Sequence, residues 1–378
     1  MRTRICDLFG IDVPLVGFTP SPEVAVAISR AGGLGVLGAV RYTSADELED
    51  ALRYIDANVG GRPYGVDVVM PMKELEGIDA GALEARIPDA HRRFVEEILG
   101  RYGVAELPAG EAARAINAWS HAYARAQVDV ALRHPVRLIA NALGSPPADV
   151  VAEAHARGVL VAALAGKAAH VRSHVEAGVD VIVAQGHEAG GHTGEVTTMV
   201  LVPEAVRAAG GRPVLAAGGI GTGAQLAAAI ALGAEGAWTG SIWLTSEEYR
   251  LDAPGPSGRS LVTEKLLAAT SSDTVRSRVV SGKPARMLRT AWTEAWEGPD
   301  GPGTLPMPLQ GMLVADAEAR IRRAQSRDLL GVPVGQIVGA MNEVRPVRVI
   351  VDALVREAEE AAARVAEAAN AGRGREAR

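Results

Sequence analysis

The chain has 378 residues, 48% of them hydrophobic and 22% charged, which is typical of a globular protein with a sizeable core. The net charge of −6 gives no broad basic surface, so we expect no nucleic-acid partner. No apolar run approaches the roughly 20 residues of a membrane-spanning helix, and the first thirty residues lack a signal-peptide pattern. The one cysteine, Cys6, leaves no intramolecular disulfide and no Cys-rich metal site. We therefore expect a cytoplasmic protein without a membrane partner.

Short runs of β-branched residues recur along the chain, each followed by a Gly or Pro signal and an Ala-rich helical pattern. This alternation is typical of βα units around a parallel sheet. The eight expected strands are 14–18, 34–39, 64–70, 136–143, 159–165, 179–185, 213–217 and 236–244. Their number predicts an α/β fold, a (β/α)8 TIM barrel rather than a doubly wound sheet.

Two intervals between predicted elements are longer than the roughly 30 residues of a βα unit. We expect a barrel at 1–248 with a charged helical insertion at about 71–135. A Gly- and Pro-rich stretch at 249–330 predicts a smaller, largely helical subdomain or lid, in which Trp292 and Trp296 pack rather than contact a ligand. The chain should return to the barrel at 331–369 with the last helix, and end in a flexible tail at 370–378.

The sixth predicted strand runs into a loop that holds two histidines, His187-Glu-Ala-Gly-Gly-His192. Chemistry in α/β folds lies at the carboxyl ends of the strands. The spacing is one residue too long for the zinc pattern H-E-x-x-H, and the Gly-Gly pair opposes a helix, so we expect no metal. A neutral imidazole here can take a proton from a carbon acid. The glycines around His192 favour a functional role for it, whereas His187 is interpreted as structural.

Glycines also mark the last two predicted strands. Gly218-Gly219 directly follows the strand at 213–217, and Gly240-Ser241 lies within the run at 236–244. Barrels often bind phosphate between these two loops, where backbone N–H groups point at the anion. The first loop also matches the loose dinucleotide fingerprint, but no acidic residue follows about 20 residues later to hold a ribose. We therefore predict a phosphate site, with simple tight turns as the alternative.

These pieces together resemble the nitronate monooxygenases, formerly called 2-nitropropane dioxygenases, which are FMN-dependent barrels. The resemblance rests on the segment 184–194, Ala-Gln-Gly-His-Glu-Ala-Gly-Gly-His-Thr-Gly, on Ala-Ala-Gly-Gly-Ile at 216–220 and on Gly240-Ser241, and it covers most of the chain. It implies an enzyme that oxidises alkyl nitronates with O2 to carbonyl compounds and nitrite. The implied partners are a small-molecule substrate and O2, and the oligomeric state stays open.

The resemblance also implies individual roles, with His192 as the active-site base or substrate-orienting residue. The flavin contacts that it implies are Phe18, Thr19, Asp67, Gln185, Ala189, Gly190, Gly191, Gly218, Gly219, Gly240 and Ser241. Two positions depart from the family pattern, because many members have Gly-Met in place of Phe18-Thr19 and asparagine in place of Asp67. An amide can both donate and accept, whereas an ionised Asp67 can only accept, so the polarity of that contact is open.

Three alternatives are weighed against this assignment. The phosphate loops also resemble IMP dehydrogenase, but that enzyme needs a cysteine on a barrel loop and this chain has none there. An NAD(P)H-dependent flavin reductase of the enoyl or quinone reductase type shares the Glu-Ala-Gly-Gly-His core and stays a full alternative. A flavin-binding module without catalysis is the third.

Overall fold

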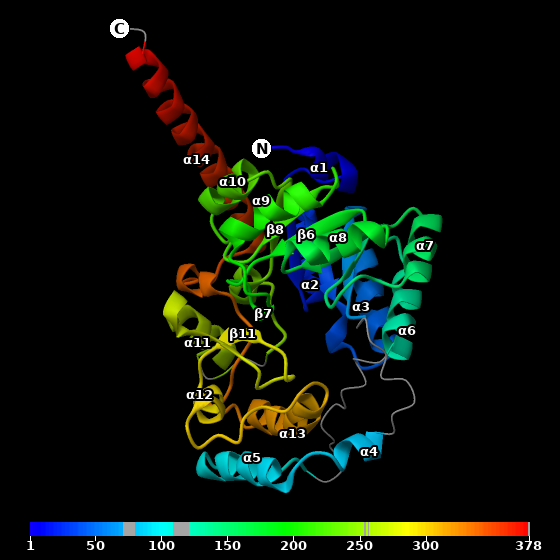
Figure 1. Cartoon of the computed structure of the whole chain (residues 1–378), viewed down its shortest axis with the longest axis vertical. Helices are drawn as coiled ribbons and strands as arrows, with labels where there is room; N and C mark the ends of the chain where they lie inside the picture. The colour runs from blue at the N-terminus through cyan, green and yellow to red at the C-terminus, as the bar shows by residue number, and fades with distance from the viewer. Residues whose placement is uncertain (71–79, 109–120, 253–254, 256, 377–378) are drawn as a thin grey trace.

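The computed structural model describes residues 1–70, 80–108, 121–252, 255 and 257–376, and its centre is a closed barrel of eight parallel strands (Figure 1). The strands follow one another around the ring in chain order: β1 (Leu15–Thr19), β2 (Leu34–Gly38), β3 (Tyr64–Val68), β4 (Leu138–Asn141), β5 (Leu160–Ala165), β6 (Val181–Gln185), β8 (Val214–Ala217) and β9 (Gly236–Thr239). The predicted (β/α)8 TIM barrel is confirmed.

Helices cover the outside of the barrel because the strands are apolar on both faces. The helices outside the barrel are α2 (Pro22–Arg30), α3 (Ala45–Asn58), α6 (His121–Ala131), α7 (Ala148–Ala156), α8 (Ala168–Glu176), α9 (Thr198–Ala208), α10 (Gly223–Ala231) and α14 (Val347–Glu376), with the short η1 (Ala39–Arg41) after β2, whereas α1 (Arg4–Phe9) precedes β1. Ile5, Cys6 and Phe9 of α1 belong to the cluster that fills the barrel interior, together with Val16 and Leu34. The apolar filling leaves the carboxyl-end rim as the place for chemistry.

The predicted last strand, 236–244, is wrong at its end. Strand β9 stops at Thr239, and η3 (Ser241–Thr245) follows Gly240. The run Ile242–Leu244 is apolar and buried, and a short buried apolar run has the same appearance in a strand and in a helical turn. The change of direction at Gly240 brings Ser241 to the rim of the barrel instead of extending the sheet.

A second group of elements comes from the interval 249–340: α11 (Leu261–Ala268), η4 (Ser271–Asp273), β10 (Thr274–Ser277), β11 (Ala285–Leu288), α12 (Ala291–Glu297), α13 (Leu309–Arg323) and η5 (Gln336–Ala340). Strands β10 and β11 were not predicted from the sequence. They form an antiparallel three-stranded sheet with β7 (Gly191–His192), in the order β10, β11, β7. This small sheet is the connection between the subdomain and the histidine loop.

The insertion after β3 packs against this subdomain. Between β3 and the barrel helix α6, the described residues hold α4 (Ala80–Glu84) and α5 (Asp89–Arg101), and Figure 1 shows α5 beside α13. The guanidinium Nη1 of Arg320 in α13 donates a hydrogen bond to the carboxylate Oε1 of Glu96 in α5 at 2.8 Å. The ring of Phe94 packs edge-on against that of Trp296, with the ring centroids 5.0 Å apart. Trp292 and Trp296 are both buried, so they pack as expected. Residues 71–79 and 109–120 of the predicted insertion lie outside the described residues.

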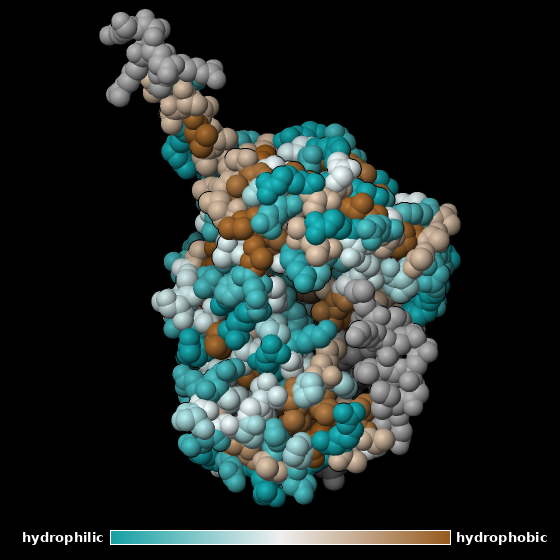
Figure 2. Space-filling model, viewed as in Figure 1, coloured by the Kyte–Doolittle hydropathy of each residue, from teal (hydrophilic) through white to brown (hydrophobic). Residues whose placement is uncertain are grey.

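The last helix, α14, is longer than predicted. The sequence predicts its end near residue 369, yet the helix continues to Glu376, and residues 362–371 are all exposed. Figures 1 and 2 show this end of the helix standing clear of the body. In the described part of the chain, no helix combines the length and the apolarity needed to cross a membrane.

We expect Gly223→Ala to destabilise the barrel strongly. A Cβ at Gly223, the first residue of α10, would lie 2.3 Å from Ala358 N and from Leu354 O of α14, so the two helices would have to move apart. Overpacking of this kind costs about 1–3 kcal/mol. The matched control is Gly100→Ala in α5, where a Cβ meets nothing within 4 Å and helix propensity gains up to about 1 kcal/mol. Thermal unfolding should show a lower Tm for the first and an equal or higher Tm for the second.

Candidate functional site

The carboxyl ends of the strands place several predicted site residues around one mouth. Side chains alternate along a strand, and Val16 and Phe18 of β1 and Val181 and Val183 of β6 face the barrel interior. The same alternation directs Gln185 into the mouth. Thr19 lies on the other face of β1, where its Oγ1 accepts a hydrogen bond from Ser21 N at 3.1 Å. Only the backbone of Thr19 is therefore available to a ligand in the mouth.

The loop after β6 is held by its glutamate. The carboxylate of Glu188 accepts hydrogen bonds from the N and Oγ1 atoms of Thr198, at 3.0 and 2.9 Å, where α9 begins. A negative charge at a helix N-terminus is favourable because the helix dipole is positive there. Glu188 therefore fixes the direction in which the loop leaves the barrel.

His187 makes its contacts outside the mouth. The guanidinium of Arg286 donates from Nε to the His187 carbonyl at 3.1 Å and from Nη1 to Thr274 Oγ1 at 2.9 Å. Burial and the neighbouring Arg286 lower the pKa of His187. His187 thus joins the loop to the β10–β11 hairpin, which is a structural role.

His192 lies on β7 and contacts the turn of the same hairpin. Its Nδ1 lies 3.2 Å from the carbonyl oxygen of Pro284, and its Nε2 lies 3.4 Å from Oγ of Ser281. Because a carbonyl can only accept, Nδ1 carries the proton and Nε2 keeps its lone pair. Burial lowers the pKa of His192 and outweighs the Pro284 hydrogen bond, which raises it. The imidazole is therefore neutral at pH 7 and can accept a proton at Nε2.

Sequence reasoning did not find Ser281 and Pro284. They lie about 90 residues after His192 along the chain, in the turn between two strands of four residues each. The available signal is the Ser-Gly-Lys-Pro turn at 281–284 between two short runs that contain β-branched and apolar residues.

The two glycine loops carry backbone donors without partners. In the described part of the chain, the amides of Gly219, Ile220, Gly240 and Ser241 donate no hydrogen bond. Gly218 and Gly219 have φ of +102° and +69°, in the left-handed region that favours glycine. Unpaired amides at the ends of two neighbouring strands are the arrangement that binds a phosphate.

A third segment, 333–336, joins the phosphate loop to the histidine loop. Gly335 N donates to Ser241 Oγ at 2.8 Å, and Gln336 N donates to the Glu188 carbonyl at 2.9 Å. A Cβ at Gly190 would lie 2.8 Å from the Val334 and Gly335 backbone, so the close approach requires glycine there. Ala189 is buried in the same contact region, with its N–H bonded to the Gly186 carbonyl at 3.2 Å.

The structure thus brings the predicted residues together at one rim: Phe18, Asp67 and Gln185 from β1, β3 and β6, Gly190 to His192 from the loop, and Gly218, Gly219, Gly240 and Ser241 from the last two strands. Among the residues that the structure describes, no three His, Cys, Asp or Glu side chains converge as metal ligands would. The rim therefore combines one imidazole, one buried carboxyl and backbone N–H donors.

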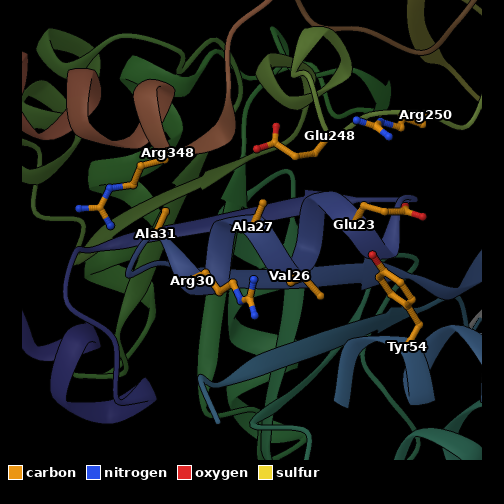
Figure 3. Close-up of a pocket in the computed structure, with 9 residues that line it drawn as sticks. All are labelled: Glu23, Val26, Ala27, Arg30, Ala31, Tyr54, Glu248, Arg250 and Arg348. Atoms are coloured by element: carbon orange, nitrogen blue, oxygen red, sulfur yellow. The ribbon is translucent and has the colours of Figure 1, made fainter. Parts of the chain in front are cut away.

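A separate cavity of about 690 Å³ lies on the outer side of the barrel over α2. Figure 3 shows Tyr54 and the arginines Arg30, Arg250 and Arg348 around it. It contains none of the rim residues, so we place no chemistry there.

The chain is similar to known proteins over most of its length. Residues 3–357 match the family model for nitronate monooxygenase. The chain is 52% identical over 370 residues to a monooxygenase-named protein of Mycobacterium tuberculosis, covering 94% of this chain and 96% of the relative.

Two solved structures are also similar over nearly the whole chain. A nitroalkane oxidase of Streptomyces ansochromogenes has a TM-score of 0.77 and 28% identity, covering 96% of this chain and 99% of its own. FabK of Thermotoga maritima has a TM-score of 0.72 and 26% identity, covering 97% and 99%. The chain belongs to the nitronate monooxygenase family and is an oxidoreductase.

Proposed function

We propose that this oxidoreductase binds FMN at the barrel mouth and oxidises alkyl nitronates with O2 to carbonyl compounds and nitrite. The observation that supports this most is His192, whose acceptor nitrogen Nε2 belongs to the same rim as two loops of unpaired amides. Membership of the nitronate monooxygenase family and the similarity to a nitroalkane oxidase structure support the reaction class.

The residues present fit a flavin mononucleotide. The amides of Gly219, Ile220, Gly240 and Ser241 would hold its phosphate. Phe18, Asp67, Gln185 and the glycines at 190–191 would lie along its ring system. When bound, the flavin would supply the electron transfer that the reaction with O2 requires.

His192 would act on the substrate. A neutral nitroalkane must lose a proton from the carbon next to its nitro group to become a nitronate. Nε2 can accept that proton because Nδ1 is already bonded to Pro284. The resulting imidazolium would then stabilise the nitronate anion beside it. A nitronate supplied ready-made would not need this step.

We also propose that the subdomain at 249–330 forms one wall of the substrate pocket. Its β10–β11 hairpin carries Ser281 and Pro284, which contact both nitrogens of His192. Through α13 it also contacts the helical insertion, which would extend the same wall.

The test is direct. Purified protein mixed with FMN and freed of excess should be yellow, with one FMN per chain, and should release nitrite from an alkyl nitronate in air. A protein that takes up no FMN contradicts the proposal, as does one that binds FMN but yields no nitrite.

The second candidate, an NAD(P)H-dependent flavin reductase, is favoured by the similarity to FabK. The two functions separate in one pair of measurements. NADH or NADPH is mixed with the FMN-loaded protein without oxygen, and a nitronate is mixed with it in air. If the nicotinamide rapidly bleaches the flavin and the nitronate yields no nitrite, the protein is a flavin reductase and not a nitronate monooxygenase.

A further inference from the structure

Asp67 is a buried carboxyl at the barrel mouth, and it has no partner among the residues that the structure describes. The residue is 5% exposed, and within the described part of the chain no hydrogen bond or ion pair joins its carboxyl to another residue. Aspartate is rarely buried unless it is paired, because removing a charge from water is costly. The burial of Asp67 is therefore best explained by a ligand that contacts its carboxyl when the site is occupied.

The alternation of β3 directs Asp67 into the barrel. Tyr64, Val66 and Val68 pack outward against the helices, so Gly65 and Asp67 face inward. The residues in register with Asp67 on the neighbouring strands are Gly38 and Ala140, which carry almost no side chain. Neither of these two in-register neighbours can therefore cover the carboxyl or pair with it.

Burial also changes the charge of this group. It raises the pKa of Asp67 well above the usual range, and no charged group of the described residues contributes to that change. The protonated form thus persists to a higher pH than in an ordinary aspartate. A carboxylic acid has one O–H donor and keeps acceptor capacity, so it offers the same two functions as an asparagine amide.

We propose that Asp67 binds the pyrimidine edge of the flavin as a neutral carboxylic acid, donating one hydrogen bond and accepting another. This inference rests on the proposed binding of FMN. The flavin's pyrimidine ring presents carbonyl oxygens as well as one N–H, so an ionised carboxylate would match only the N–H and would repel the oxygens. Cofactor retention is then coupled to pH, because FMN is held by the protonated protein and released as Asp67 ionises.

The coupling has a defined sign. FMN binding favours the protonated form, so affinity falls by up to about tenfold for each pH unit above the pKa of Asp67 in the free protein. Without FMN, the raised pKa contributes stability that is fully present below the unfolded value of about 3.9 and is lost as pH rises through the folded value. The Tm of wild type should therefore fall with rising pH relative to that of Asp67→Asn, which stays neutral.

The experiment compares wild type, Asp67→Asn and the control Asp50→Asn, an exposed residue of α3. FMN affinity is measured by flavin fluorescence quenching from pH 6 to pH 9. We expect affinity to fall with pH in wild type and Asp50→Asn, and the fall to be absent in Asp67→Asn. Equal pH profiles in wild type and Asp67→Asn would overturn the proposal.

Infrared difference spectra of wild type against Asp67→Asn provide the second readout, with and without FMN. We expect a protonated-carboxyl band at pH 7 that shifts when FMN binds. Absence of the band, or a band that FMN leaves unchanged, contradicts the inference. If wild type binds no FMN at any pH, the proposed function fails and this contact fails with it, while the band still reports whether Asp67 is protonated.

Discussion

His192→Asn is expected to reduce turnover of a neutral nitroalkane by about 10²–10⁴-fold, the usual contribution of a positioned general base. Asparagine can keep a hydrogen bond to the Pro284 carbonyl, but its amide is not a base. FMN binding and turnover of a preformed nitronate should change little, since neither needs the proton abstraction. Steady-state rates with the two substrate forms, and the flavin content of the variant, measure this.

The pH profile of wild type provides a second check. Because burial lowers the pKa of His192 below its usual 6.5, the fall in kcat/KM for the neutral nitroalkane with decreasing pH should lie lower than the pH at which an ordinary histidine takes up its proton. His170→Asn, at an exposed position of α8, is the control and should keep the full rate. Equal losses on nitroalkane and nitronate in His192→Asn would show that His192 is not the base.

Gly240→Asp is expected to abolish tight FMN binding while the fold is kept. Gly240 has φ −133°, and a Cβ there would meet only Phe18, at an ordinary 3.7 Å. The added carboxylate would face the phosphate, and two unit charges about 5 Å apart at an effective dielectric of about 20 repel by about 3 kcal/mol. That corresponds to a loss of at least about a hundredfold in affinity, measured by fluorescence titration.

Gly240→Ala is the matched control, because it adds the Cβ without the charge and should bind FMN within a few-fold of wild type. The Tm of both variants without FMN shows that the fold is intact. Gly218 is less suitable for this test, since its φ of +102° and a Cβ 3.0 Å from Thr198 Oγ1 would strain the loop itself. Wild-type affinity in Gly240→Asp would place the phosphate elsewhere.

The sequence predicts the barrel well because its signals are local. A β-branched run such as 181–185 is recognisable from its own residues. Eight such runs separated by helical patterns are compatible with only a few folds. The glycines at 218–219 and the histidine at 192 are local in the same sense, since each lies in the loop that follows a predicted strand.

What the sequence does not reveal depends on contacts between distant segments. Pro284 sets the tautomer of His192 across 92 residues, and its hairpin consists of short strands with arginines directly opposite each other, a weak strand pattern. Asp67 is a similar case. Its identity is visible in the sequence, but its protonation depends on burial between strands that carry Gly38 and Ala140.

The segment 333–336 has a consequence for synthesis of the protein. It donates hydrogen bonds to Ser241 and to the Glu188 carbonyl, and it comes late in the chain. The chain must therefore leave the ribosome beyond residue 336 before these hydrogen bonds can hold both loops. All eight barrel strands are complete almost a hundred residues earlier. Cofactor loading is then a late step in biogenesis, and nascent chains that stop short of this segment would form a barrel with unbraced loops.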